Sequence, residues 1–401
     1  MGRLADRRMW GRPSRLALAV LCCLYLAQSA PAACPSADLT GDCFVDFEDF
    51  AVMAAQWPTT DFNDIAAMAA RWLTTDPCIP HDMAYIPDGT FEMGGSFAEG
   101  DADELPVHTV TLDSFYMGKY EITNAEYCTY LNSALGSSIY VSAGVVRGSE
   151  DNQPYCYTSA YLSSSPIVHS DGVFSLRTKG ERSMANDPMG MVTWYGAVAY
   201  CNWRSQQEAR EQCYTLRTWS CDFSKKGYRL PTEAEWEYVA RGGLAGRRFP
   251  WGDTISHSQA NYFSSTDYAY DISPTPGGHP LWNDGVRPYT SPVGFFDGTT
   301  KYQGDYQWAG SATSYQTTSG ANNYGLYDMA GNSSEWCNDR YSSSYYSSSP
   351  LNNPTGPTSG PSRVLRGGGS DLNPNADYCR AASRFNMSGI NPFGFRLVLS
   401  D

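Results

Sequence analysis

Oxygen donors, aromatic rings and glycines are concentrated between Tyr324 and Trp336, where the chain reads Tyr-Gly-Leu-Tyr-Asp-Met-Ala-Gly-Asn-Ser-Ser-Glu-Trp. Asp328, Asn332 and Glu335 supply hard oxygen atoms, and glycine permits backbone angles that other residues resist. Such a loop suits a hard cation such as calcium. An ordinary aromatic-flanked turn between two strands has a similar composition, so the residue types alone leave both interpretations open.

Other catalytic arrangements have little support in the sequence. No Gly-x-Ser-x-Gly nucleophile motif and no phosphate-binding glycine loop between a strand and a helix is present. The five histidines are scattered without the spacing of a metal site, at positions 81, 108, 169, 257 and 279. The chemistry of the chain therefore rests on its oxygen ligands and its cysteines.

The N-terminus predicts export. Five arginines precede the apolar run from Leu16 to Leu26, and Ala30-Pro-Ala32 offers a small-x-small cleavage site, which is the pattern of a secretory signal peptide over residues 1–33. The run is too short to span a bilayer and no later segment is long and apolar enough, so we expect no membrane span. We expect a secreted or cell-surface protein, extracytoplasmic in a bacterium; a lipid anchor on Cys34 is a lesser alternative.

The charge of the mature chain argues against a nucleic-acid partner. The full chain carries a formal net charge of -14, and residues 1–33 hold five Arg and one Asp, so their removal leaves -14 - 4 = -18. A strongly acidic surface repels phosphate backbones. The cysteines that remain after cleavage are expected to form disulfides in an exported chain, and Cys213 and Cys221 could close a short hairpin.

An internal repeat opens the mature chain. Asp46–Trp57 recurs as Asp61–Trp72, which predicts two short Ala-rich helices. Ahead of the first helix, oxygen ligands stand at positions 1, 3, 5, 9 and 12 of a calcium loop: Asp38, Thr40, Asp42, Asp46 and Asp49. Residues 34–78 thus resemble a dockerin type I module, which implies attachment to a cohesin-like protein.

Two departures from the dockerin pattern limit the expected calcium to one ion. Cys43 stands at loop position 6, where glycine is expected, and the second unit keeps only Asp61 to Asp64 of its loop. An acidic solvated face leading into a helical hairpin is the alternative interpretation of this module.

After residue 80 the composition changes to strands and turns. Alternation predicts strands within 83–95 and over 107–117. Helices are predicted over 121–131, where Thr-x-x-Glu forms a capping box, over 194–203, and in 228–241, where Pro231 and Thr232 mark a helix start. Much of the remainder is loop rich in Gly, Ser and Tyr.

Residues 83–401 resemble the sulfatase-modifying factor, or formylglycine-generating enzyme, family. The landmarks stand in family order: Met93–Gly95, Tyr120–Glu126, Ala197–Cys201, Arg229–Glu237, Phe249–Gly252, Tyr324–Trp336, Arg366–Gly368 and Gly394–Arg396. The resemblance implies an α+β fold of the C-type lectin-like kind, with little regular secondary structure. It also implies two calcium sites, at Asn261, Tyr262, Asp284 and Val286, and at Asp328, Gly331, Ser333 and Glu335, with carbonyls as the ligands at 262, 286, 331 and 333.

The copper chemistry of the family is not expected here. Its members bind copper(I) between two cysteines five residues apart, and soft thiolates suit that ion. With Arg380 and Arg384 as the register anchor, the two positions fall on Asp371 and Ala376. Cys379 lies three residues further on, and a disulfide between Cys337 and Cys379 is one expectation for it. Calcium is therefore the expected cofactor, and copper is not.

Two classes of function remain open. The first is a non-oxidising binding protein that takes an unknown protein, peptide or glycan; the segment 366–396 also resembles the variable region of retroelement-diversified display proteins, whose contacts are adaptable. Its expected ligand-binding surface comprises Asp371, Asn373, Tyr378, Arg384, Phe385 and Asn386. The second class is an enzyme that modifies sulfatase cysteines without the copper pair.

Overall fold

The computed structural model describes residues 82–369 and 375–400. The chain divides into two compact units, Met1–His81 and Asp82–Asp401, and only the second is described below. The predicted signal peptide (1–33) and dockerin-like module (34–78), including its calcium ligands, lie outside the described residues. So do Asp371 and Asn373. No helix of the described part is long and apolar enough to cross a membrane.

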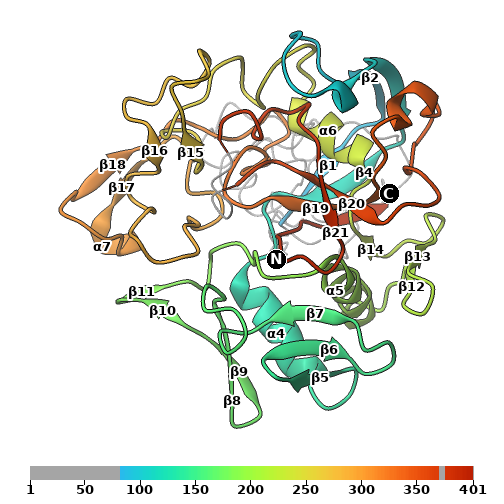
Figure 1. The fold of residues 1–401 in the computed structure, drawn as a ribbon, viewed down its shortest axis with the longest axis vertical. Coiled ribbons are helices and arrows are strands. Elements are labelled where there is room, and N and C mark those ends of the chain that lie inside the picture. The colour runs from blue at the N-terminus through green and yellow to red at the C-terminus, as the bar shows by residue number, and fades with distance from the viewer. Residues whose placement is uncertain (1–81, 370–374, 401) are drawn as a thin grey trace, which may run out of the picture. The chain divides into compact units, whose positions relative to one another are not determined.

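A four-stranded antiparallel sheet joins the two ends of the domain (Figure 1). In spatial order its strands are β1 (Met83–Ile86), β4 (Phe115–Gly118), β22 (Val398–Ser400) and β14 (Tyr228–Arg229). Because β4 pairs with both the first and the last strand, residues more than 280 positions apart in sequence meet across it, as with Met83 and Val398 against β4. The domain is thereby closed by its own termini.

Two further groups of strands pack near this sheet. β19 (Glu335–Arg340), β20 (Ser362–Arg366) and β21 (Phe385–Ser388) form a three-stranded sheet, and β2 (Gly89–Met93) pairs with β3 (His108–Leu112). The single strand predicted over 107–117 is wrong. The chain breaks at Asp113-Ser114, because β3 belongs to the β2 hairpin whereas β4 crosses into the central sheet.

The predicted helices are confirmed. They are α4 (Asn124–Ala134), α5 (Trp194–Gln207) and α6 (Glu233–Arg241). Thr123 and Thr232 each close a capping box with the glutamate three residues later, which satisfies backbone donors at both ends of the box. In α5, a Cβ on Gly196 would lie 2.0 Å from the carbonyl oxygen of Tyr155, so the helix needs glycine to reach its neighbouring strand.

The rest of the domain is loop with short hairpins around these elements, so the fold is strand-rich and mixed, with few helices. The three-stranded meander is β5 (Ile139–Ser142), β6 (Val145–Gly148) and β7 (Pro154–Tyr157). The hairpins are β8 (Ile167–Ser170) with β9 (Val173–Leu176), β10 (Thr178–Lys179) with β11 (Arg182–Ser183), β12 (Tyr214–Thr215) with β13 (Ser220–Cys221), β15 (Phe263–Ser264) with β16 (Gly277–Gly278), and β17 (Thr300–Tyr302) with β18 (Ser314–Gln316). Three single turns of helix complete the described elements: α7 (Gln303–Tyr306) and two 3-10 turns, Ala102–Glu104 and Tyr345–Ser348.

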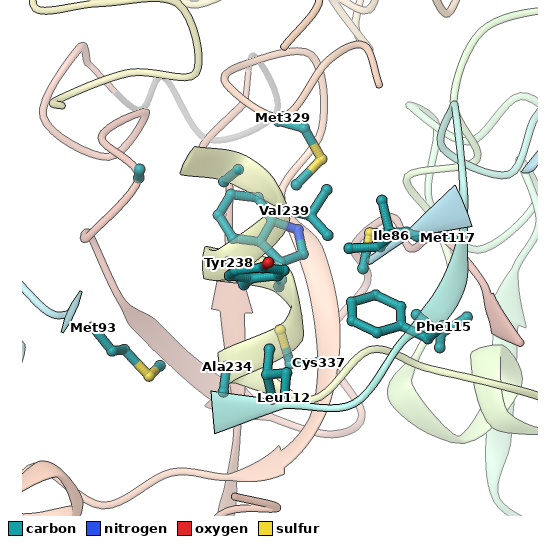
Figure 2. Close-up of a cluster of buried hydrophobic side chains, with 14 of the residues drawn as sticks. Ile86, Met93, Leu112, Phe115, Met117, Ala234, Tyr238, Val239, Met329 and Cys337 are labelled. Atoms are coloured by element: carbon teal, nitrogen blue, oxygen red, sulfur yellow. The ribbon is translucent and has the colours of Figure 1, made fainter. Parts of the chain in front are cut away.

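The main core forms where α6 lies between the central sheet and β19. All nine residues of α6 are buried, and Val239 faces Ile86, Phe115 and Met117 of the sheet (Figure 2), whereas the Tyr238 ring packs against Phe91. Burying a large apolar side chain contributes roughly 1.5–3 kcal/mol. Because α6 is buried on every side, its position is fixed. The ionised side chains that it carries, described below, are therefore held in place as well.

The cysteines of the described part do not form disulfides: all seven are free. The expected Cys337–Cys379 bond is absent because the two side chains belong to different core clusters, one beside α6 and the other beside Phe249. The expected Cys213–Cys221 bond is also absent. Cys213 stands just before β12, and the register partner of Cys221 is Tyr214 instead.

Candidate functional site

The loop between Asp328 and Glu335 is folded tightly by three residues with left-handed backbones. Asp328, Gly331 and Asn332 have φ angles of 58°, 94° and 64°. The Asn332 amide N–H donates to the carbonyl of Asn261 over 2.7 Å, and its side chain donates to Glu121 over 3.0 Å. A loop that departs this far from ordinary backbone angles is held by its surroundings, which here include a buried carboxylate.

Glu335 stands at the start of β19 and is fully buried. Arg396 holds both of its carboxylate oxygens, with Nε–Oε2 at 2.7 Å and Nη2–Oε1 at 2.6 Å. The indole N–H of Trp236, on α6, donates to Oε2 over 2.9 Å. Glu335 is therefore the centre of a bidentate ion pair, which is the strongest geometry for such a contact.

Three buried carboxylates share this single arginine. Burial raises the pKa of Asp328 to about 6. Burial, followed by the charges of Asp328 and Glu335, raises the pKa of Glu121 well above its usual range. Glu121 is a residue that the sequence prediction missed, although it stands within the landmark Tyr120–Glu126. Its carboxylate accepts from the N–H of Ser333 over 3.0 Å.

The second predicted calcium set, at Asp328, Gly331, Ser333 and Glu335, fits a divalent cation in charge. When all three carboxylates are ionised, three negative charges meet one positive charge and two are left uncompensated. No three or more His, Cys, Asp or Glu side chains of the described part are grouped so that they could hold a metal. Carbonyl oxygens of the loop would therefore have to complete any coordination, as the prediction states. This set stays a prediction.

The residues of the first predicted calcium set make other contacts in this structure. Asp284 pairs with Lys179, with Nζ–Oδ1 at 3.0 Å. The Asn261 side-chain amide donates to the carbonyl of Tyr289 over 2.8 Å, and the Tyr262 carbonyl bonds with Nε2 of His257 at 3.2 Å. Val286, whose carbonyl was the fourth predicted ligand, is half exposed.

His279 is buried close to this region. Its Nε2 bonds with the carbonyl of His257 at 2.9 Å, and the N–H of Leu281 donates to its Nδ1 over 3.2 Å. The ring also contacts Trp282 and Phe296. Burial, followed by the nearby His257, lowers the pKa of His279 well below its usual value.

We therefore expect His279 to reduce stability as the pH falls. The unfolded chain takes up the proton near pH 6.5, whereas the folded chain resists it to lower pH, so stability is full above pH 6.5 and is lost as the pH falls below it. The loss approaches about 1.4 kcal/mol per pH unit for one group. Urea midpoints at pH 7.5 and 5.5 measure it. His279→Phe should flatten the dependence, and an unchanged slope in that variant would contradict the assignment.

Ala376 stands at one of the two positions aligned with the copper-binding cysteines of the family. This residue is fully buried and packs with Phe249 and Cys379. Burial raises the pKa of the Cys379 thiol, which keeps it protonated, whereas the thiolate is the form that binds metal.

The expected ligand-binding surface is only partly exposed. Tyr378 is exposed, and Phe385 and Asn386 are half-buried. Arg384 is buried instead of exposed: its guanidinium makes a two-bonded ion pair with Glu233 at 2.8 and 2.6 Å and lies 4.1 Å from the ring centre of Tyr346. Arg384 therefore supports the core and does not face a ligand.

An open groove of about 720 Å³ lies beside Asp377. Tyr268 and Tyr270 form a stacked pair in its wall, with ring centres 5.3 Å apart. The Tyr270 hydroxyl donates to Asp377 over 3.2 Å. The guanidinium of Arg248 lies 4.7 Å from the Tyr270 ring and bonds with Glu99 at 2.5 Å. The complete lining is Glu99, Gly100, Asp101, Arg248, Asp253, Thr254, Asp267, Tyr268, Ala269, Tyr270 and Asp377.

The groove was not foreseen because its walls come from four separate parts of the chain. Residues near 100, 250, 268 and 377 meet there, and none of these segments carries a recognisable motif for the groove. The Phe249–Gly252 landmark lies next to one wall, which is the one signal that pointed to this region.

The described domain is mixed and loop-rich, and a buried Glu335–Arg396 pair lies next to its tight Asp328 loop. Residues 72–400 match the sulfatase-modifying factor enzyme 1-like domain, so the chain belongs to this family.

Two curated relatives and one solved structure are similar to this chain. The formylglycine-generating enzyme of Streptomyces coelicolor is 33% identical over 71% of this chain and 76% of its own length. The serine/threonine-protein kinase Pkn1 of Chlamydia trachomatis is 32% identical over 79% of this chain but only 38% of its own length. The solved structure of Treponema denticola variable protein 1 covers 80% of this chain and 95% of its own at 24% identity, with a TM-score of 0.47.

Proposed function

We propose that this chain is a non-oxidising member of the sulfatase-modifying factor family: an exported binding module that takes a peptide or glycan in the groove at Tyr268 and Tyr270. The single observation that carries the proposal is this groove, with its stacked tyrosines, beside a buried Ala376 where an oxidising relative needs a thiolate. Calcium at the Asp328 loop would stabilise the module, and the dockerin-like residues 34–78 would attach it to a cohesin-like partner.

The groove suits such a ligand in shape and chemistry. It is open, with a volume of about 720 Å³, and its two tyrosines offer flat apolar faces with polar edges. Five carboxylates and one arginine line it, so a basic or neutral ligand is favoured over an acidic one. Aromatic rings with interspersed polar groups are typical of recognition surfaces.

Support for the other elements of the proposal is indirect. A divalent cation at the loop would compensate the negative charge that Glu121, Asp328 and Glu335 carry when they are ionised. The spacing of Asp38, Thr40, Asp42, Asp46 and Asp49 favours a calcium loop in the attachment module. A second function, oxidation of sulfatase cysteines, has no observation of its own in the described residues, since Cys379 is buried and has no thiol partner there.

Binding to an array of basic and neutral peptides and of glycans tests the proposed groove, with the full mature chain as the probe. For the ligand that binds best, Tyr270→Ala should weaken the affinity about tenfold, because loss of one aromatic contact costs roughly 1–1.5 kcal/mol. Tyr302→Ala, at an exposed tyrosine of the outlying β17 hairpin, is the matched control and should change nothing. Equal loss in both variants, or no ligand on the array, would overturn the proposal.

A further inference from the structure

The loop from Trp282 to Thr290 is held by a hairpin that supplies cations. β10 and β11 bring Lys179 and Arg182 against it. The Lys179 ammonium bonds with the carbonyl of Pro288 at 2.9 Å as well as with Asp284. Arg182 pairs with the buried Asp187 and lies 4.7 Å from the ring centre of Trp282.

A third cation strengthens this arrangement. Arg177, just before β10, donates to the carbonyls of Ser163 and Ser164 over 2.8 and 3.1 Å, and also to the carbonyl of Arg287 in the loop. Asp284 is the single carboxylate between Trp282 and Thr290. The positive charges that surround it therefore already exceed its own charge.

We infer that the Lys179 ammonium occupies the place that a calcium ion holds in the family's first site, so that this loop is fixed by a tethered side chain and takes no metal. Three observations carry the inference. The one carboxylate of the predicted set is paired, with only 4% of the Lys179 side chain exposed. The Tyr262 carbonyl bonds with the His257 ring, and the side-chain nitrogen of Asn261 donates to the Tyr289 carbonyl. A divalent ion bound to Asp284 would lie next to the Lys179 ammonium, which is 3.0 Å from that carboxylate, and would also be repelled by the charge of Arg177.

The contacts of Lys179 are those expected of an ammonium group that stands in place of a calcium ion. Calcium takes six to eight oxygen ligands, whereas an ammonium needs three acceptors at most. Two acceptors are already in place, Asp284 and the Pro288 carbonyl, and the Tyr289 ring lies 5.8 Å from the ammonium. An ammonium carried on the chain needs no free ion, so this loop stays folded at any calcium concentration. The inference confines calcium dependence in the described domain to the Asp328 loop.

Calcium content and stability together test the inference on the full mature chain. After dialysis against buffered calcium, Asp284→Asn should retain as many calcium equivalents as the unsubstituted protein, measured by plasma mass spectrometry. In chelator, Lys179→Met and Asp284→Asn should each lower the urea midpoint, and the double variant should lower it by no more than the larger single effect, because both remove one contact.

The control is Lys301→Met, which removes a similarly buried lysine whose partner is Asp297. Its effect should add in full to that of Asp284→Asn, since the pairs are separate. Loss of one calcium equivalent in Asp284→Asn would overturn the inference. So would a Lys179→Met chain as stable in chelator as the unsubstituted protein, and this second readout stands even if Asp284→Asn fails to fold.

Discussion

Arg396→Met is expected to lower the free energy of unfolding by about 3–5 kcal/mol, the cost of leaving a buried charge without its partner. Both oxygens of Glu335 are bonded by this guanidinium, and neither side chain is exposed. Arg396 also donates to the carbonyls of Gly118 and Tyr327, each over 3.0 Å. One side chain thus joins β4, the Asp328 loop and β19.

Removing the Arg396 guanidinium would also increase the excess of negative charge next to the Asp328 loop. Without Arg396, the carboxylates of Glu121, Asp328 and Glu335 would repel one another. Protonation of one of them would reduce that repulsion. Urea unfolding at neutral pH measures the loss of stability. The matched control is Arg247→Met, whose ion pair with Asp253 is exposed on both sides and should contribute less than about 1 kcal/mol. Equal shifts in the two variants would contradict the central position given to Arg396.

A second large effect is expected for copper. The unsubstituted chain should not compete with a copper(I) chelator, because no thiolate pair is present in the segment from Gly367 to Tyr378. The double variant Asp371→Cys, Ala376→Cys should compete, since two thiolates five residues apart restore the ligands that copper(I) prefers. Ala376→Cys alone is the control and should not, because the nearby Cys379 is buried and protonated. Competition by the unsubstituted chain would contradict the proposed function.

Local signals in the sequence predicted the local structure well. The helix starts at Thr123 and Thr232 follow from side chains three residues apart, so a short window contains everything that decides them. The break between β3 and β4 was not predictable in this way. Residues 107–117 alternate as one strand would. The break exists because the first half, β3, pairs with β2, whereas the second half, β4, pairs with β22.

The site was predicted in composition but not in contacts. The Tyr324–Trp336 stretch identified Asp328 and Glu335, but the third carboxylate, Glu121, lies more than 200 residues away in sequence and meets them through Asn332 and Ser333. Lys179 likewise pairs with Asp284, more than 100 residues away in sequence. Spacing along the chain cannot show such pairs, because the fold alone brings them together.

Disulfides show the same limit. The expectations for Cys337 with Cys379 and for Cys213 with Cys221 rested on closeness to motifs and in sequence. Cys337 and Cys379 belong to different core clusters, and spacing along the chain does not specify core membership. The remaining described cysteines, at 128, 156 and 201, are buried as well, where a thiol behaves as a small apolar group.

Mass spectrometry of a Cys-x-Pro-x-Arg peptide, incubated in air with the purified chain and copper(I), tests the proposed function most directly. We expect the peptide to keep the mass of its thiol form, with the unsubstituted chain and with Cys379→Ser alike. A shift to the mass of the aldehyde with the unsubstituted chain would contradict the account, and loss of that shift in Cys379→Ser would identify this buried thiol as the oxidising group.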